Sequence, residues 1–130
     1  MNDETPFNAP VPAASPIPDE ATNLPHNIEA EQQLLGAILT SNDVLDRVDD
    51  LVKPDHFHDP IHAALFEMAA ARIAKGLQTD ATTLKTFAGD IPGMEALGGA
   101  EYLVKLQLSA IATSAARDYA QLIHDLAARR

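Results

Sequence analysis

Apolar residues recur every three or four positions along most of the chain after position 26, which is the spacing of one face of an α-helix. The clearest case is the stretch NIEAEQQLLGAIL at 27–39, in which five aliphatic residues share one stripe: Ile28, Leu34, Leu35, Ile38 and Leu39. No convincing stretch shows the strict alternation that marks a half-buried strand. The pattern therefore predicts an all-α protein of about six or seven helices joined by short loops.

Polar residues just before the stripes predict where the helices begin. Asn27, Asn42 and Asp80 each precede a periodic stretch, and Asp59 does so together with Pro60. Asn and Asp accept hydrogen bonds from the free N–H groups of a first helical turn. Proline suits the first helical position because the N–H that it lacks would be unpaired there.

The stretch 89–99 contains four glycines and one proline, which predicts a turn-rich connection with at most one helical turn inside it. Gly98 and Gly99 are expected to form a turn between helices. Helical periodicity resumes at 100–108 and again at 112–130, where Thr113 or Ser114 can cap the last helix. The last helix is still periodic at its end, so we expect the chain to be the front part of something longer.

These two last helices predict a helical hairpin over 100–130 that follows a compact helical head over 25–99, with its second helix apparently truncated. Two such helices are not expected to bury all of their apolar edges against a small head. Self-association through that edge is therefore a hypothesis. The residues of the edge are Leu103, Leu106, Tyr119, Ile123 and Leu126.

The N-terminal segment has a different composition, with six of the nine prolines of the chain in Met1–Pro25. It offers few residues to bury, so residues 1–24 are expected to be a flexible, Pro-rich tail. Docking through a proline motif is the alternative. The segment has neither the basic nor the apolar region of a secretory signal.

Charge and composition then narrow the function classes. Nine basic residues stand against nineteen acidic ones, a formal net charge of −10, so little direct contact with DNA phosphates is expected. The chain has no Cys, which excludes disulfides. No apolar run approaches the roughly 20 residues of a membrane span. We expect a cytoplasmic protein that binds other proteins and no membrane.

Known catalytic motifs are missing from the sequence. It contains no G-x-x-x-x-G-K-[ST] phosphate loop, no G-x-G-x-x-G, no H-E-x-x-H and no G-x-S-x-G. Carboxylates are plentiful, but no pair is buried by its pattern. We therefore expect no catalytic residue and no cofactor in this chain.

The stretch HFHDPIHAALFEM at 56–68 raises the question of a metal site. Zinc needs three or four converging ligands, and His58 and His62 have helical spacing only if both lie on one helix. The Asp59–Pro60 helix start separates them, and His56 precedes both in a loop. We predict no metal ligands here; a small metal-dependent enzyme is the weakest alternative.

Five stretches together resemble the N-terminal domain of the DnaB-type replicative DNA helicase, in order and spacing, over about residues 24–130. They are LPHNIEAEQQLLGAIL, HFHDPIHAALFEM, TDATTLKTFA, GGAEYLVKL and ATSAARDYAQLI. The resemblance implies a helical head followed by a hairpin, with hairpins that pair into dimers within a hexamer. It further implies that this tier of the ring recruits primase and supports ring stability and loading by a helicase loader.

In that family the ATP and Mg sites and most DNA contacts belong to a C-terminal motor domain, so the resemblance implies a non-catalytic chain. Glu29 and Tyr102 match family positions that bear on primase coupling or domain arrangement. The alternative is that Glu29 is only a dipole-favoured acid and Tyr102 only a core aromatic. The resemblance also makes His62 the structural histidine and leaves His56 and His58 facing solvent. A free-standing regulator of a host helicase or primase, as phages and plasmids carry, is the alternative function.

Overall fold

The structure is a computed structural model that describes residues 26–110 and 112–130. Those residues form seven α-helices and two short 3₁₀ turns and contain no strand, so the predicted all-α class is confirmed. The elements are α1 (Ile28–Thr40), α2 (Val44–Val48), η3 (Pro54–His56), α3 (Pro60–Ala74), α4 (Ala81–Ala88), α5 (Met94–Leu97), α6 (Ala100–Ser109), η4 (Thr113–Ala115) and α7 (Ala116–Arg129). The tail expected at 1–24 lies outside the described residues.

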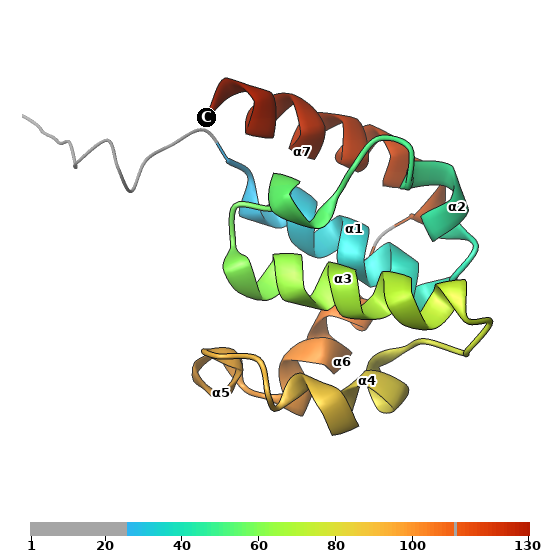
Figure 1. Ribbon diagram of the computed structural model, residues 1–130, viewed down its shortest axis with the longest axis vertical. Coiled ribbons are helices and arrows are strands. Elements are labelled where there is room, and N and C mark those ends of the chain that lie inside the picture. Colours follow the sequence, from blue (N-terminus) through green and yellow to red (C-terminus); the bar gives the residue numbers. More distant parts are fainter. Residues whose placement is uncertain (1–25, 111) are drawn as a thin grey trace, which may run out of the picture.

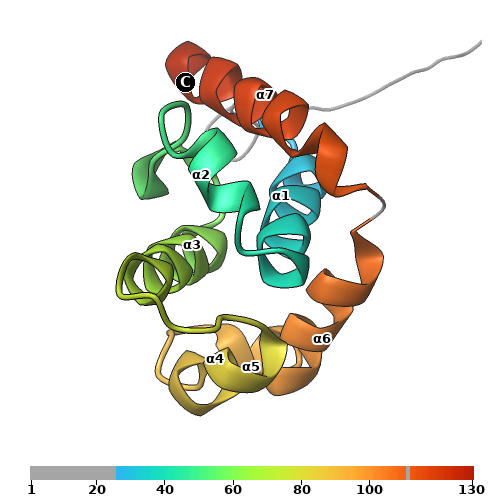
Figure 2. The same cartoon turned by 90° about the vertical axis from the view of Figure 1, so that its right-hand side faces the viewer.

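Helix α1 forms the centre of the fold. It packs against α3, α6 and α7, and in Figure 1 and Figure 2 it lies between α7 on one side and α6 on the other. Every residue from Ala30 to Leu39 except Gln32 is buried. A helix that is buried on nearly every side lies in the core, and α1 does so although Glu31 and Gln33 are among its buried residues.

Gly36 allows α6 to approach α1 closely. A Cβ at this position would lie 2.2 Å from the backbone oxygen of Leu106. No side chain is tolerated at that distance from a backbone atom, so the α1–α6 packing depends on this glycine.

Three predicted caps are confirmed. The side chain of Asn27 accepts from the Ala30 N–H, that of Asp59 from the Ile61 N–H, and that of Asp80 from the Thr83 N–H. Pro60 is the first residue of α3, as expected. Each of these bonds spans no more than three residues, which is why local sequence predicts them.

The predicted cap of the second helix is wrong. Asp43 holds the N-cap position of α2 without a side-chain bond, and α2 ends at Val48. Asn42 instead donates to the Ile38 and Thr79 oxygens, at 2.9 and 2.7 Å, and accepts from the Thr79 N–H. Its amide therefore ties the end of α1 to the loop before α4, 37 residues further along the chain.

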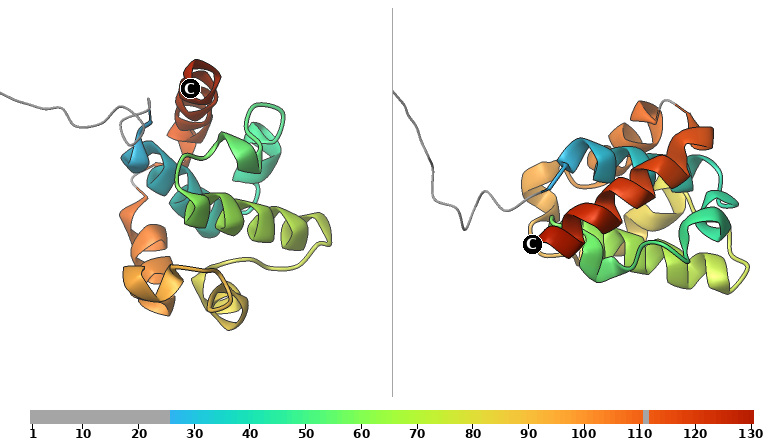
Figure 3. Two further views of the ribbon diagram at one scale, coloured as in Figure 1. Left: turned by 60° about the vertical axis from the view of Figure 1, so that its left-hand side comes forward. Right: turned by 90° about the horizontal axis from the view of Figure 1, so that it is seen from above.

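Helices α6 and α7 follow each other as the expected hairpin does, yet each packs against α1, which lies between them (Figure 3). The apolar face of α7, with Ala116, Ala120 and Ile123, is buried in the common core. The Arg117 guanidinium of α7 donates two hydrogen bonds to the Asp50 carboxylate, from Nη1 at 3.0 Å and from Nη2 at 3.2 Å. Part of the predicted apolar edges is thus covered within the chain. The division into a head over 25–99 and a hairpin over 100–130 stays a prediction.

The predicted cap of the last helix is also wrong. Thr113 and Ser114 lie inside η4, and Ala115 holds the N-cap position of α7. The glycine-rich connection holds only the single turn α5, as expected, and Gly98 and Gly99 form the turn between α5 and α6. No helix in the described part of the chain is both long and apolar enough to cross a membrane.

Candidate functional site

Three helices of the core meet at a buried polar cluster formed by Glu31 of α1, His62 of α3 and Tyr102 of α6. Their exposed fractions are 1%, 0% and 7%. His62 Nδ1 lies 2.9 Å from a Glu31 carboxylate oxygen, and His62 Nε2 lies 2.6 Å from the Tyr102 hydroxyl. The cluster links residues 31, 40 and 71 positions apart in sequence, so it holds α1, α3 and α6 together.

The second carboxylate oxygen of Glu31 extends the cluster to the loop before α3. The backbone N–H of His58 donates to it at 2.6 Å, and that of Asp59 donates to the other oxygen at 3.3 Å. On the far side, the Gln32 amide donates to the Tyr102 hydroxyl at 3.2 Å. A buried carboxylate is tolerated when its lone pairs are satisfied, and Glu31 meets that condition.

The hydrogen bonds can be arranged in only one consistent direction when His62 is neutral. A carboxylate only accepts, so Nδ1 carries the proton that faces Glu31, and Nε2 accepts from the Tyr102 hydroxyl. The hydroxyl oxygen then accepts from Gln32. Burial is the main cause that raises the pKa of Tyr102, with the Asp59 and Glu31 charges adding to it and the Gln32 bond opposing it.

A glutamate, a histidine and a tyrosine in a row are also the parts of an acid–base relay. Here the imidazole is completely buried, and neither surface groove described below is lined by a residue of the cluster. Neither groove therefore gives a substrate access to the side chains of Glu31, His62 and Tyr102. The arrangement therefore stabilises the packing of three helices.

Sequence reasoning selected Glu29 from the opening motif and missed Glu31. Glu29 is exposed in the first turn of α1, whereas Glu31 is buried two residues later. The available indication was position: Glu31 lies three residues after Ile28 and four before Leu35, on the apolar stripe of its own helix. An acid on an apolar stripe requires a buried partner, and a histidine on the stripe of 60–74 was available.

The structure separates the two residues that the family resemblance singles out. Tyr102 is buried and bonded to His62 and Gln32, while Glu29 is exposed on the first turn of α1. Tyr102 is thus a core aromatic with a structural bond, and Glu29 is accessible to a partner.

The histidines of 56–62 do not converge. His62 is buried and structural, as expected. His56 accepts from the Lys53 N–H at Nδ1 and meets the His124 ring edge-on, and His58 stacks on His26 at 4.0 Å. Both are half-buried, so each is only partly exposed to the solvent that it was expected to face. No group of three or more His, Cys, Asp or Glu within 26–110 and 112–130 is arranged to hold a metal ion.

Three of the five residues proposed for self-association face inward. Leu103, Leu106 and Ile123 are at most 2% exposed and belong to the core. They cannot contact a second copy while α1 covers them. Tyr119 and Leu126 are half-buried, and they share a stripe with Leu122, which is 38% exposed. This narrower stripe on α7 is the part of the expected edge that remains accessible.

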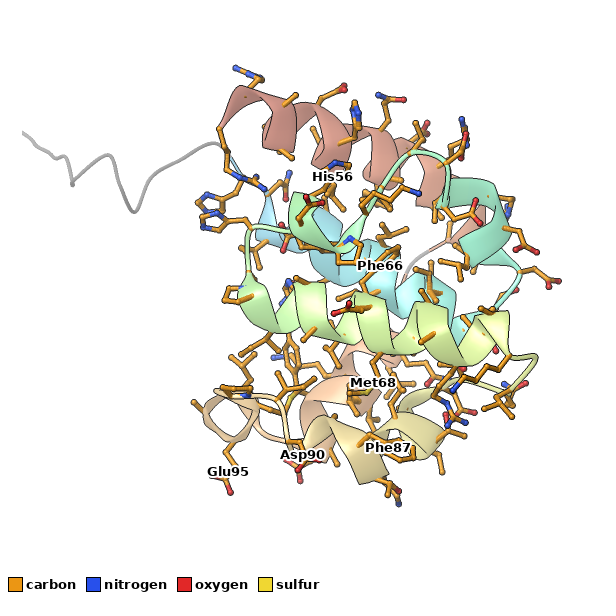
Figure 4. All side chains as sticks on the ribbon, viewed as in Figure 1. His56, Phe66, Met68, Phe87, Asp90 and Glu95 are labelled. Atoms are coloured by element: carbon orange, nitrogen blue, oxygen red, sulfur yellow. The ribbon has the colours of Figure 1, made fainter. Side chains whose placement is uncertain are left out.

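The described surface has two grooves along α3. One, of about 330 Å³, lies between the C-terminal half of α3 and α4 and is lined by Met68, Ala71, Arg72, Lys75, Leu77 and Phe87. In Figure 4, Met68 and Phe87 approach each other between these helices. The other, of about 300 Å³, lies on the opposite side of α3, where Phe66 meets residues of α2 and the loop that follows it.

Comparison with known proteins places this small helical domain in a family. Residues 23–125 match the family described as DnaB-like helicase N terminal domain. The chain belongs to this family.

The relatives agree with that assignment. The chain is 36% identical over 130 residues to the Replicative DNA helicase DnaB of Rickettsia conorii, and it is 30% identical over 106 residues to the protein of that name from Pasteurella multocida. These alignments cover 100% and 82% of this chain but only 26% and 23% of the relatives. The chain therefore spans about a quarter of the length of these curated relatives. They give no support to the alternative of a free-standing regulator.

A solved structure has the same fold. The crystal structure of the N-terminal domain of DnaB helicase from Mycobacterium tuberculosis superposes with a TM-score of 0.74 at 27% sequence identity. The match covers 81% of this chain and 76% of that one. The expected fold class and family are confirmed.

Proposed function

We propose that this chain is the non-catalytic N-terminal domain of a replicative DNA helicase and supports hexamer assembly and the docking of primase or a helicase loader. The family match over residues 23–125 carries the proposal, since the matched relatives are named replicative helicases. ATP and Mg would serve a motor domain elsewhere in such a protein, because this sequence has no phosphate-binding loop. Its place of action would be the cytoplasm.

The surface supports protein partners over DNA. A net charge of −10 repels the phosphates of DNA. The cluster of Glu31, His62 and Tyr102, which contains the groups of an acid–base relay, is buried. Large apolar residues remain accessible on four described helices: Phe87 on α4, Leu97 on α5, Val104 on α6 and Leu122 on α7 are between 38% and 47% exposed, and Leu108 on α6 is 80% exposed. Such residues are available for contacts with other chains of the assembly.

Primase docking is tested with full-length primase from the same genome and the 130-residue chain, by isothermal titration calorimetry. We expect saturable binding that Glu29→Ala weakens, because Glu29 is exposed and does not support the core. Glu101→Ala is the matched control, an exposed acid in the first turn of α6. If the correctly folded chain binds no primase, docking by this chain is excluded.

Self-association is tested separately by sedimentation velocity over a range of concentrations. We expect the α7 stripe of Tyr119, Leu122 and Leu126 to pair two copies, so Leu122→Glu should shift the chain toward monomer. Val104→Glu places the same charge on an exposed position of α6 and should not. Monomer alone at the highest concentration would remove the role of this stripe in assembly.

A further inference from the structure

The groove between α3 and α4 combines apolar walls with two positive charges. Leu77 and Phe87 are each 45% exposed at its rim, and Met68 lies between them and the core. The only charged residues in its lining are Arg72 and Lys75. This concentration of positive charge is unusual in a chain with more than twice as many acidic as basic residues.

Arg72 has hydrogen-bonding capacity that the fold does not use. Its Nη2 donates to the Gln78 oxygen at 3.0 Å, and its guanidinium carbon lies 5.6 Å from the centre of the Phe87 ring. Its Nε is buried, yet within the described residues it has no hydrogen-bond partner. Buried donors are nearly always paired, so the bonding of this guanidinium is incomplete within the described residues.

Local structure accounts for the shape of the groove but not for this donor. Gly76 has φ of +75°, and the Leu77 N–H returns to the Arg72 oxygen, so α3 ends in a turn that holds Leu77 beside Arg72. Basic side chains at a helix C-terminus are favoured by the helix dipole. Neither effect requires an unpaired Nε or two exposed large apolar side chains.

We propose that this groove binds the chain's own segment Asp3–Phe7, DETPF. In the sequence of this segment, Phe7 supplies an aromatic ring that would suit the apolar rim of Leu77 and Phe87, and Asp3 and Glu4 supply carboxylates that would complement Arg72 and Lys75. The segment offers the chemistry that the groove lacks: two adjacent acids and an aromatic ring within five residues. Met1–Pro25 contains four acids and no Lys or Arg, so its charge is complementary to that of the lining.

The chain length permits this contact. The described part begins at His26, whose ring stacks on His58, two residues before the start of α3. The groove occupies the other end of that helix, and 15 residues of α-helix are about 22 Å long. The 19 residues from Phe7 to His26 reach at most about 60 Å. The connection is long enough to follow the surface, and a tethered ligand gains from its high effective concentration.

The test uses paramagnetic relaxation on the full chain. The chain has no Cys, so Asn8→Cys gives one attachment point for a nitroxide label beside the segment. We expect loss of amide signal intensity at Met68, Ala71, Leu77 and Phe87 beyond any loss at α2. Asp3→Asn with Glu4→Gln should restore that intensity, while the matched change Asp19→Asn with Glu20→Gln should not.

Two results would overturn the proposal. The first is an absence of selective signal loss at the groove amides. The second is equal loss in a mixture in which the nitroxide and the isotope label are on different molecules, which would assign the groove to a second copy. Arg72→Gln should release the segment as the double tail variant does. If Arg72→Gln perturbs the fold, the two double tail variants still test whether the segment binds the groove, since they change no residue of the described helices.

Discussion

The two ends of α3 hold polar groups in opposite ways. Near its N-terminus, His62 is completely buried and both ring nitrogens have partners, on α1 and on α6. Ten residues later, Arg72 lies at a surface groove with a buried Nε that is unpaired within the described residues. A satisfied buried polar network makes its part of the structure rigid, whereas an unsatisfied buried group is uncommon and costs free energy. One helix thus supports the fold at one end and, at the other, carries the groove that we propose for recognition.

The largest effect expected from this difference is that of Glu31→Ala. Removing the carboxylate leaves His62 and the N–H groups of His58 and Asp59 without their acceptor in the core. Breaking a buried charged contact in this way costs about 3–5 kcal/mol of unfolding free energy. Urea denaturation followed by circular dichroism measures the loss.

Glu29→Ala is the matched control for Glu31→Ala. It changes the same residue type two positions away on the same helix, but at an exposed site. It should alter the unfolding free energy by no more than about 0.5 kcal/mol. Equal effects of the two variants would show that the buried cluster does not contribute to stability.

A smaller loss is expected for Tyr102→Phe, which keeps the ring and removes the hydroxyl. His62 Nε2 and the Gln32 amide then lose a partner in the core. An unsatisfied buried group costs about 1–3 kcal/mol. Because Tyr102 is buried, primase binding per folded molecule should be unchanged, which calorimetry checks against Glu29→Ala. Weaker binding by folded Tyr102→Phe would instead assign a direct role to the hydroxyl.

The same variant makes a prediction about alkaline pH. Burial raises the pKa of Tyr102 above its usual value of 10.0, so the folded state retains a proton that the unfolded state releases. Stability from this group is therefore complete below pH 10 and is lost as pH rises through the higher folded-state pKa. The difference in unfolding free energy between wild type and Tyr102→Phe should shrink above pH 10. A difference that stays constant up to pH 12 would contradict the raised pKa.

How far the sequence predicts these features depends on the range of the contact. The caps at Asn27, Asp59 and Asp80 are bonds across two or three residues, so the local pattern contains them. Asn42 has the same local pattern, but its partner Thr79 is 37 residues away, and that contact replaces the cap. Periodicity identifies an apolar face without identifying what covers it.

The same limit explains the candidate site. Leu103 and Ile123 were correctly identified as apolar-face residues, but α1 covers them in place of a second copy. Glu29 and Glu31 both suit the N-terminal turns of a helix, where the dipole favours acids. Glu31 differs in lying on the apolar stripe, and the approach of α3 supplies His62, the buried partner that this position requires. The groove at Arg72 forms where α4 packs beside α3, so no local sequence pattern predicts it.

Arg72→Gln, at the other end of α3, is expected to cost less stability than Glu31→Ala or Tyr102→Phe. The substitution removes the contact with the Phe87 ring and the bond to Gln78, both at the surface of the fold, whereas Glu31→Ala removes bonds in the core. An exposed cation–aromatic contact is worth about 0.5–1 kcal/mol, so the unfolding free energy should fall by no more than that amount. Urea denaturation beside Glu31→Ala checks it. A loss as large as that of Glu31→Ala would show that both ends of α3 serve the fold, and it would remove the reason to assign Arg72 to recognition.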